Sequence, residues 1–114
     1  MKNNKKHVII IEDDKTTQSL YSYIFKQELK GIEFEIVDSV EEATPLLKSN
    51  HYDLYIVDML LRGGVDGSVL INTKYRPMMI VTAIPIQQKV SSVEYMQKPI
   101  NMDEFIEKVK QLIG

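Results

Sequence analysis

Apolar residues along the chain follow two alternating patterns. Continuous apolar runs of strand length lie at HVIII (7–11) and LYIVDM (54–59), as expected for strands buried on both faces of a sheet. Shorter runs predict three more strands, at 34–37, 78–82 and 94–98. Between these strands, apolar residues with helical spacing predict helices at 14–30, 40–49 and 101–113. The residues with N-cap chemistry at these helix starts are Asp14, Ser39 and Asn101.

This order of elements predicts an α/β fold. Strands that alternate with helices form a doubly wound, five-stranded parallel sheet with helices on both faces. Two of its helices are expected to be short or degenerate. The third has only the residues between Gly67 and Pro77. The fourth helix and the fifth strand must both fit between Thr82 and Lys98, which are 16 positions apart. Because a crossover connection needs at least ~10–12 residues, the fourth helix has at most about two turns.

Composition restricts the classes of protein that fit the chain. The 114 residues predict one domain, 1–114, with 44% apolar and 26% charged residues. A net charge of −2 predicts no nucleic-acid partner and no anionic membrane partner. Cysteine is absent, and the first apolar run stops at Glu12 after four residues, too soon for a signal peptide or a membrane span. We therefore expect a cytoplasmic protein.

Polar residues follow four of the predicted strands where each strand ends. Glu12 and Asp13 end the first strand, Asp58 the third, Thr82 the fourth and Lys98 the fifth. The carboxyl ends of parallel strands share one edge, where ligands bind in such sheets. Clustered carboxylates there favour Mg²⁺. Together with the hydroxyl of Thr82 and the ammonium group of Lys98, these carboxylates provide the groups needed to bind a phosphoryl group during its transfer.

Four segments resemble the signatures of a response-regulator receiver domain of two-component signalling, the CheY-like family. They are IIIEDD, DLYIVDMLLRGGVDG, MIVTA and YMQKP, and the resemblance extends from about Lys6 to Ile113. It implies a flavodoxin/CheY-like fold. It also implies that Asp58 accepts a phosphoryl group from the phosphohistidine of a histidine kinase or a histidine phosphotransfer protein.

The same resemblance implies a role for each residue at this edge. Mg²⁺ would be bound by Glu12, Asp13, Asp58 and the backbone carbonyl of Leu60. Thr82 and Lys98 would contact the phosphoryl group, and Thr82 and Tyr95 would form a conformational switch. The Lys98–Pro99 peptide bond is expected to be cis.

Two departures from the family pattern change the expectations for this chain. Arg62 stands where the family usually has Pro, and Gly63–Gly64 lengthens the loop after Asp58. The short fourth helix alters the surface through which receivers usually meet partners, so we expect an atypical output surface. The downstream partner is not identified, and the chain is expected to be a monomer or a weak dimer.

The leading functional hypothesis is a stand-alone receiver that acts as a phosphorylation-dependent switch or relay. It would catalyse only its own phosphorylation and dephosphorylation and would not be an enzyme in the ordinary sense. The alternative is a pseudo-receiver, a protein-interaction module without phosphoryl chemistry. A phosphatase of the haloacid dehalogenase type needs a second Asp two positions after its nucleophile, where Leu60 stands. A dinucleotide-binding loop would place G-x-G-x-x-G where EDDKTT stands.

Overall fold

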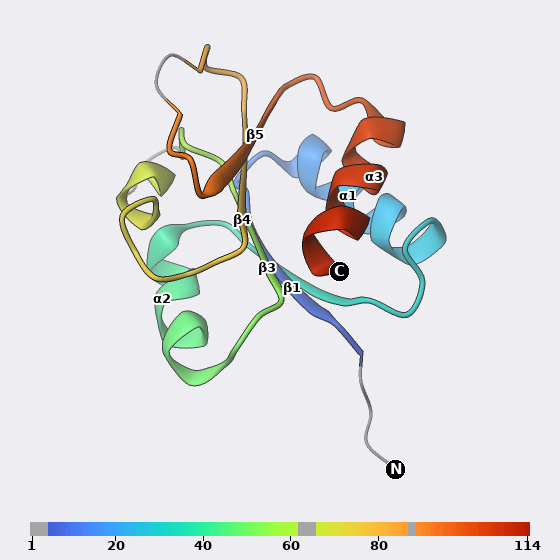
Figure 1. Cartoon of the computed structure of the whole chain (residues 1–114), viewed down its shortest axis with the longest axis horizontal. Helices are drawn as coiled ribbons and strands as arrows, with labels where there is room; N and C mark the ends of the chain where they lie inside the picture. Colours follow the sequence, from blue (N-terminus) through green and yellow to red (C-terminus); the bar gives the residue numbers. More distant parts are fainter. Residues whose placement is uncertain (1–4, 62–65, 87–88) are drawn as a thin grey trace.

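The computed structural model of the chain (Figure 1) describes residues 5–61, 66–86 and 89–114. Its centre is a five-stranded sheet with the order β2-β1-β3-β4-β5, and every neighbouring pair is parallel. The strands are β1 (His7–Ile11), β2 (Glu33–Val37), β3 (Leu54–Val57), β4 (Met78–Thr82) and β5 (Val93–Gln97). The predicted five-stranded parallel sheet is confirmed.

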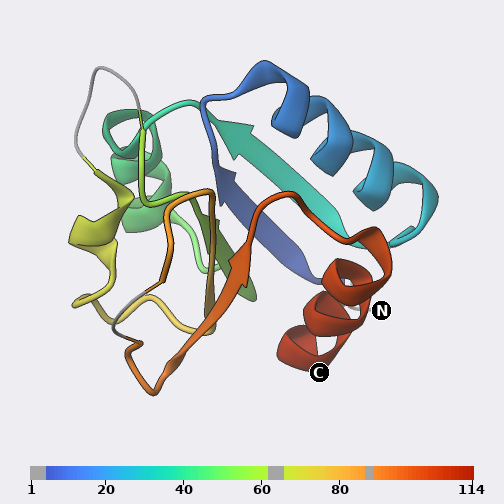
Figure 2. The ribbon, with the colours of Figure 1, turned by 90° about the horizontal axis from the view of Figure 1, so that it is seen from above.

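Helices cover both faces of this sheet, as Figures 1 and 2 show. On one face lie α1 (Lys15–Gln27) and α3 (Met102–Ile113), and on the other lie α2 (Val40–Ser49) and the short 3₁₀ helix η1 (Gly67–Leu70). Each layer encloses its own apolar cluster. Tyr21, Phe25 and Phe105 fill the α1/α3 side, while Ala43 and Leu47 of α2 pack on the opposite side. Successive side chains of the central strands point to opposite faces and pack in the two clusters in turn. The central strands therefore have uninterrupted apolar sequences.

The three predicted N-caps are confirmed. The side chain of Asp14 accepts a hydrogen bond from Thr17 N, that of Ser39 from Glu42 N and that of Asn101 from Glu104 N. These bonds satisfy backbone donors that the first helical turn leaves without partners. They also fix the points at which the chain leaves the carboxyl edge of the sheet and enters α1, α2 and α3.

The third and fourth helices are short or degenerate, as predicted. The third is the single 3₁₀ turn η1, and no helix occurs between β4 and β5 in the described residues 83–86 and 89–92. The strands β1 and β4 have the predicted bounds, and the bounds of the other three differ from the predicted ones by one or two residues. The clearest case is β3, which ends at Val57 because the last register pair with β1 is Ile11 with Val57.

Two peptide bonds that precede proline are cis. The Lys98–Pro99 bond has the predicted conformation, and the Arg76–Pro77 bond shares it. The predicted loop features at Arg62, Gly63 and Gly64 lie outside the described residues. No helix in the described part of the chain combines the length and the hydropathy that crossing a membrane requires.

Candidate functional site

The acidic residues of the site follow β1 and β3, the two strands between which the strand order reverses. From β1 the chain moves outward to β2 and then returns past β1 to β3. Loops diverge above such a switch point and leave a crevice at the carboxyl ends of the strands. Glu12 and Asp13 follow β1, and Asp58 follows β3. Asp58 N donates to Ile11 O over 3.1 Å, which holds the two strand ends together.

Three carboxylates converge in this crevice. Each of Glu12, Asp13 and Asp58 offers one oxygen, and these oxygens lie within 4.8 Å of one another. Glu12 and Asp58 are buried, whereas Asp13 is half-buried. Hard divalent cations of the size of Mg²⁺ take oxygen ligands of this kind and keep several waters. The donor set therefore fits the predicted Mg²⁺ chemistry.

Lys98 joins two of the acids. Its Nζ donates to Glu12 Oε1 over 2.8 Å and to Asp58 Oδ2 over 3.0 Å, from a position after the end of β5. Burial by itself would lower the pKa of Lys98, but the hydrogen bonds to Glu12 and Asp58 outweigh burial and raise the pKa. The ammonium group thus stays charged and compensates part of the negative charge of the cluster.

Glu12 is the most deeply buried of the three acids. Besides Lys98, it accepts a hydrogen bond at Oε2 from Asp14 N over 3.0 Å. Burial raises the pKa of Glu12, and the bonds from Lys98 and Asp14 offset burial only in part. Ionised Glu12 is therefore maintained at a cost to the folded state.

One hollow of about 290 Å³ brings the predicted residues together. It is lined by Glu12, Asp13, Asp58, Thr82 and Lys98, with Leu60, Ala83, Asp14 and Thr17 around them. The Thr82 hydroxyl is buried and accepts a hydrogen bond from Ile84 N over 3.3 Å. Leu60 N donates to Asp58 Oδ1 over 3.2 Å, and the Leu60 side chain is exposed. The role of the Leu60 carbonyl as a metal ligand stays a prediction.

Tyr95 is the one predicted site residue that does not line this hollow. It pairs with Ile80 of β4, two residues before Thr82, so Tyr95 and Thr82 belong to the same face of the sheet. Its hydroxyl accepts a hydrogen bond from Val90 N over 2.9 Å. Among the described residues no hydrogen bond joins Tyr95 to Thr82, and their joint switching stays a prediction.

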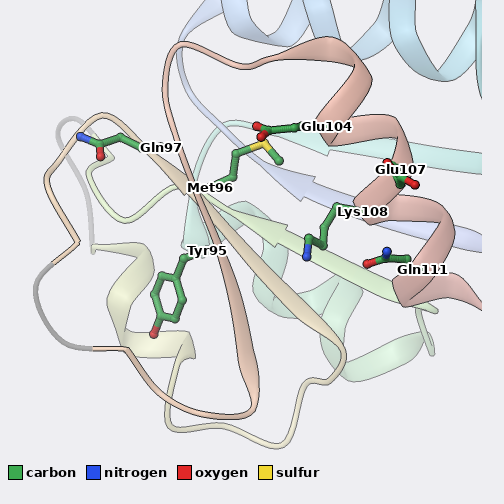
Figure 3. Close-up of a pocket in the computed structure, with 7 residues that line it drawn as sticks. All are labelled: Tyr95, Met96, Gln97, Glu104, Glu107, Lys108 and Gln111. Carbon is green, nitrogen blue, oxygen red and sulfur yellow. The ribbon is translucent and has the colours of Figure 1, made fainter.

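A larger hollow, of about 530 Å³, lies between β5 and α3. Figure 3 shows Met96 pointing toward α3 and the ring of Tyr95 pointing away from it, as the alternation along a strand requires. Lys108 of α3 forms an ion pair with Glu94 over 3.1 Å. This hollow lacks the convergent carboxylates of the smaller one, so we place the chemistry in the smaller one.

Three residues that support the site escaped the sequence analysis. Gln18 Nε2 donates both to the backbone carbonyl of Glu12 and to Asp38 Oδ1, which ties the loop after β1 to the loop after β2. Gly67 approaches Asp58 so closely that a Cβ atom at position 67 would lie 2.0 Å from Asp58 O. The sequence offers no signal for the pairing of Gln18 with Asp38, whereas a Gly that begins a helix after the loop that follows Asp58 is a signal for close approach of the backbone.

Comparison with known proteins gives a single structural class. No protein-family model and no curated protein matches the chain at the sequence level. Solved structures match it over nearly its whole length. A chain from the complex of the histidine kinase ThkA with the response regulator TrrA shares 27% identity at a TM-score of 0.76, covering 96% of this chain and 99% of that one.

Two further neighbours are described as receiver domains. One is a CheY-like receiver domain protein from Methanospirillum hungatei, with 22% identity, a TM-score of 0.77 and coverage of 96% of this chain and 94% of that one. The other is the receiver domain of a sensor histidine kinase from Pseudomonas aeruginosa, with a magnesium ion coordinated in its active-site cleft; it shares 18% identity at a TM-score of 0.77, covering 96% and 98%. The chain therefore has the CheY-like fold of response-regulator receiver domains, as the motifs in its sequence indicate.

Proposed function

We propose that this chain is a signalling receiver that accepts a phosphoryl group on Asp58 in a Mg²⁺-dependent reaction. The observation that carries the proposal is the arrangement around Asp58. Its carboxylate lies at a strand end, is held by Lys98 over 3.0 Å, and shares a hollow with Glu12, Asp13 and the hydroxyl of Thr82. The receiver-domain fold supports a role in two-component signalling.

The reaction would transfer the phosphoryl group from a phosphohistidine. A carboxylate oxygen of Asp58 attacks phosphorus, a P–O bond forms, and the P–N bond to the imidazole breaks. The imidazole leaves with the bonding electron pair and takes up a proton. Bound Mg²⁺, held by Asp13, Asp58 and Glu12, would neutralise charge on the phosphoryl oxygens. The Lys98 ammonium and the Thr82 hydroxyl supply the hydrogen-bond donors for that charge within the chain itself.

The site favours a single transfer over continuous turnover. Rapid hydrolysis of an aspartyl phosphate requires a group that positions or activates water. The side chain at the second position after Asp58 is Leu60, which is apolar and has no proton to exchange. We therefore infer a signalling domain with slow self-catalysed chemistry and not a phosphatase.

An apolar hollow beside the site fits a protein that delivers the phosphoryl group. It has a volume of about 550 Å³ and lies between the start of α1 and the loop after β5, with Leu20, Pro99 and Ile100 on its walls. Lys98 and Ala83 line both this hollow and the acceptor hollow. We propose that a histidine kinase or a phosphotransfer protein docks here in the cytoplasm.

The test is intact-mass spectrometry of the chain incubated with acetyl phosphate, with and without Mg²⁺. We expect one added phosphoryl group in the presence of Mg²⁺ and none in the Asp58→Asn variant. Asp66→Asn, which changes an exposed acid beyond the hollow, is the matched control and should react like the wild type. Asp13→Asn should react slowly because it loses a metal ligand. Failure of the wild type to react under any of these conditions would favour the pseudo-receiver.

A further inference from the structure

A second polar hollow lies at the opposite end of the sheet from Asp58. It has a volume of about 390 Å³ and is bordered by the end of α2 and the connection that leads from η1 into β4. The residues that define it here are Lys48, His51, Lys74, Arg76, Tyr55 and Tyr75. Tyr55 is the second residue of β3, three positions before Asp58, and no residue lines both hollows, so the two sites are separate.

The walls of this hollow are basic. Lys48, Lys74 and Arg76 line it, and no Asp or Glu does so among the described residues. None of the three cations has an ion-pair partner within the described part of the chain. The neighbouring Asp53 is engaged elsewhere, since it accepts a hydrogen bond from His7 N. A positive potential is thus concentrated on a protein whose net charge is −2.

Arg76 is fixed in place by neutral acceptors. Its guanidinium donates to Tyr75 O, Ile71 O and the hydroxyl of Ser92, over 2.9, 2.6 and 3.1 Å. A guanidinium carries five N–H groups, so these three bonds leave two N–H groups for another acceptor. The side chain is half-buried, and its charge meets no carboxylate among the described residues. A fixed guanidinium fork with free donors is well suited to an oxyanion, and phosphate is the most common one.

Ordinary helix chemistry accounts for only one of these cations. Lys48 lies in the last turn of α2, where positive charge complements the helix dipole. Lys74 and Arg76 lie in a connection that is not helical, so that explanation does not apply to them. The rings of Tyr55 and Tyr75 pack against each other, with centroids 5.3 Å apart, and give the hollow a firm wall. Of the three cations, Arg76 is the one held by hydrogen bonds, while Lys48 and Lys74 are exposed beside this aromatic wall.

We propose that this hollow binds a phosphate group, either as free inorganic phosphate or as part of a small phosphate ester. The volume matches the lower range of small-molecule sites. Binding here would leave the acceptor hollow free, so the chain would have two anion sites of different kinds, one metal-dependent and one cation-lined. The proposal does not depend on phosphorylation of Asp58.

The experiment is a titration of backbone amide resonances of the full chain in metal-free buffer at constant chloride. The probes are inorganic phosphate, ribose 5-phosphate, AMP and adenosine. We expect at least one phosphate-bearing probe to shift the amides of residues 48–51 and 74–76, and adenosine to leave them unchanged. Lys74→Glu, an exposed substitution, should weaken binding about tenfold or more. Lys110→Glu changes an exposed lysine in the last turn of α3 and should bind like the wild type.

The outcomes of this titration distinguish free phosphate from a phosphate ester, and they include results that would overturn the proposal. Tighter binding of inorganic phosphate than of either ester assigns the site to free phosphate, and the reverse order assigns it to an ester. Equal weakening by Lys110→Glu would show unspecific attraction and overturn the proposal. Equal shifts with adenosine and AMP would overturn it as well. The absence of shifts at residues 48–51 and 74–76 with every phosphate-bearing probe would also overturn it.

Discussion

Glu12 illustrates how a residue of the site can lower the stability of the fold. Burial raises the pKa of Glu12, so the folded chain holds this proton more tightly than the unfolded chain. Protonated Glu12 therefore favours folding below the ordinary pKa of the side chain, 4.5. This stabilisation is lost as the pH rises through the higher pKa that Glu12 has in the folded chain. At neutral pH the ionised side chain therefore costs stability.

We predict that Glu12→Gln raises the melting temperature at pH 7.5 in metal-free buffer. The gain should shrink to nothing as the pH falls below about 4.5, because the wild-type carboxyl is then protonated too. Glu107→Gln, an exposed change on α3, serves as the control and should show no such gain. A melting temperature for Glu12→Gln equal to or below that of the wild type at pH 7.5 would contradict the account of crowded charge. Addition of Mg²⁺ should reverse the order, since the variant has lost a ligand.

Leu60 and Ile84 bear on the lifetime of the phosphorylated form. Both are exposed apolar side chains two positions after a residue of the site, and Leu60 lines the acceptor hollow. Neither can orient a water molecule for attack on the phosphoryl group. We predict that the phosphorylated wild type outlasts the Leu60→Asn, Ile84→Glu double variant by roughly tenfold, or about 1.4 kcal/mol in barrier.

The decay is measured after removal of the phosphodonor. Val69→Asn is the control because Val69 is exposed and apolar but does not line the hollow, and its half-life should equal that of the wild type. Equal half-lives for the double variant and the wild type would show that these two side chains do not control hydrolysis.

At the scale of single elements, η1 is held against the end of β3 by its first residue. Gly67 N donates to Met59 O over 3.0 Å, and a Cβ atom on residue 67 would lie 2.6 Å from Val57 Cγ1 as well as against Asp58 O. Val57 and Asp58 are both buried at the end of β3, so neither can move without displacing the Asp58 carboxylate. Position 67 therefore has no room for a side chain larger than that of glycine.

We predict that Gly67→Ala destabilises the fold by about 1–3 kcal/mol, the usual cost of overpacking a core. It should also slow phosphorylation of Asp58, because the strand end must shift to admit the methyl group. Denaturant unfolding and the rate of phosphorylation with acetyl phosphate measure the two effects. Ser68→Ala, one residue further in η1, should leave both near wild-type values. A Gly67→Ala variant with unchanged stability would show that this contact relaxes freely.

The described residues between β4 and β5, 83–86 and 89–92, form no helix, and one of them is hydrogen-bonded to Tyr95. Tyr95 Oη accepts a hydrogen bond from Val90 N over 2.9 Å. The Thr82 hydroxyl accepts one from Ile84 N, near the start of the same segment. Phosphorylation of Asp58 would draw the Thr82 hydroxyl toward the phosphoryl oxygens and release Ile84 N. Tyr95 could then turn and release Val90 N.

We predict that hydrogen exchange in residues 84–93 changes upon phosphorylation and becomes slower over the segment as a whole. The amides of Ile84 and Val90 should be the exceptions, because each loses its hydrogen bond when Thr82 and Tyr95 move. Tyr95→Phe lacks the hydroxyl, so its Val90 amide should exchange at one rate with or without phosphorylation. Identical exchange across the segment in both states of the wild type would remove this mechanism.

For the whole molecule, the pattern of apolar residues was sufficient to predict the sheet and the edge at which the site lies. Strands buried on both faces give unbroken apolar runs such as HVIII, and parallel strands bring their ends to one edge whatever the details of the loops. Asp58 and Lys98 are 40 positions apart, yet both follow strand ends, and the structure brings their side chains within 3.0 Å. Local signals likewise predicted the caps Asp14, Ser39 and Asn101.

The remaining features depend on contacts that no local pattern encodes. Gln18 contacts Asp38 only because α1 and the loop after β2 meet above β1. The anchorage of Arg76 on Ile71 O and Ser92 depends on the path of a connection without periodicity. The short span between β4 and β5 limited the predicted fourth helix to at most about two turns, but it did not determine that the described residues there form no helix.

The most direct test of this account is to find which residue becomes an acyl phosphate. Borohydride reduces an aspartyl phosphate to homoserine, so the chain is phosphorylated with acetyl phosphate and Mg²⁺, reduced, digested and sequenced by mass spectrometry. We expect homoserine at position 58 and at no other Asp, and no homoserine when Mg²⁺ is left out. Homoserine at Asp13 or Asp66, or an unmodified Asp58 under conditions that keep the fold intact, would contradict it.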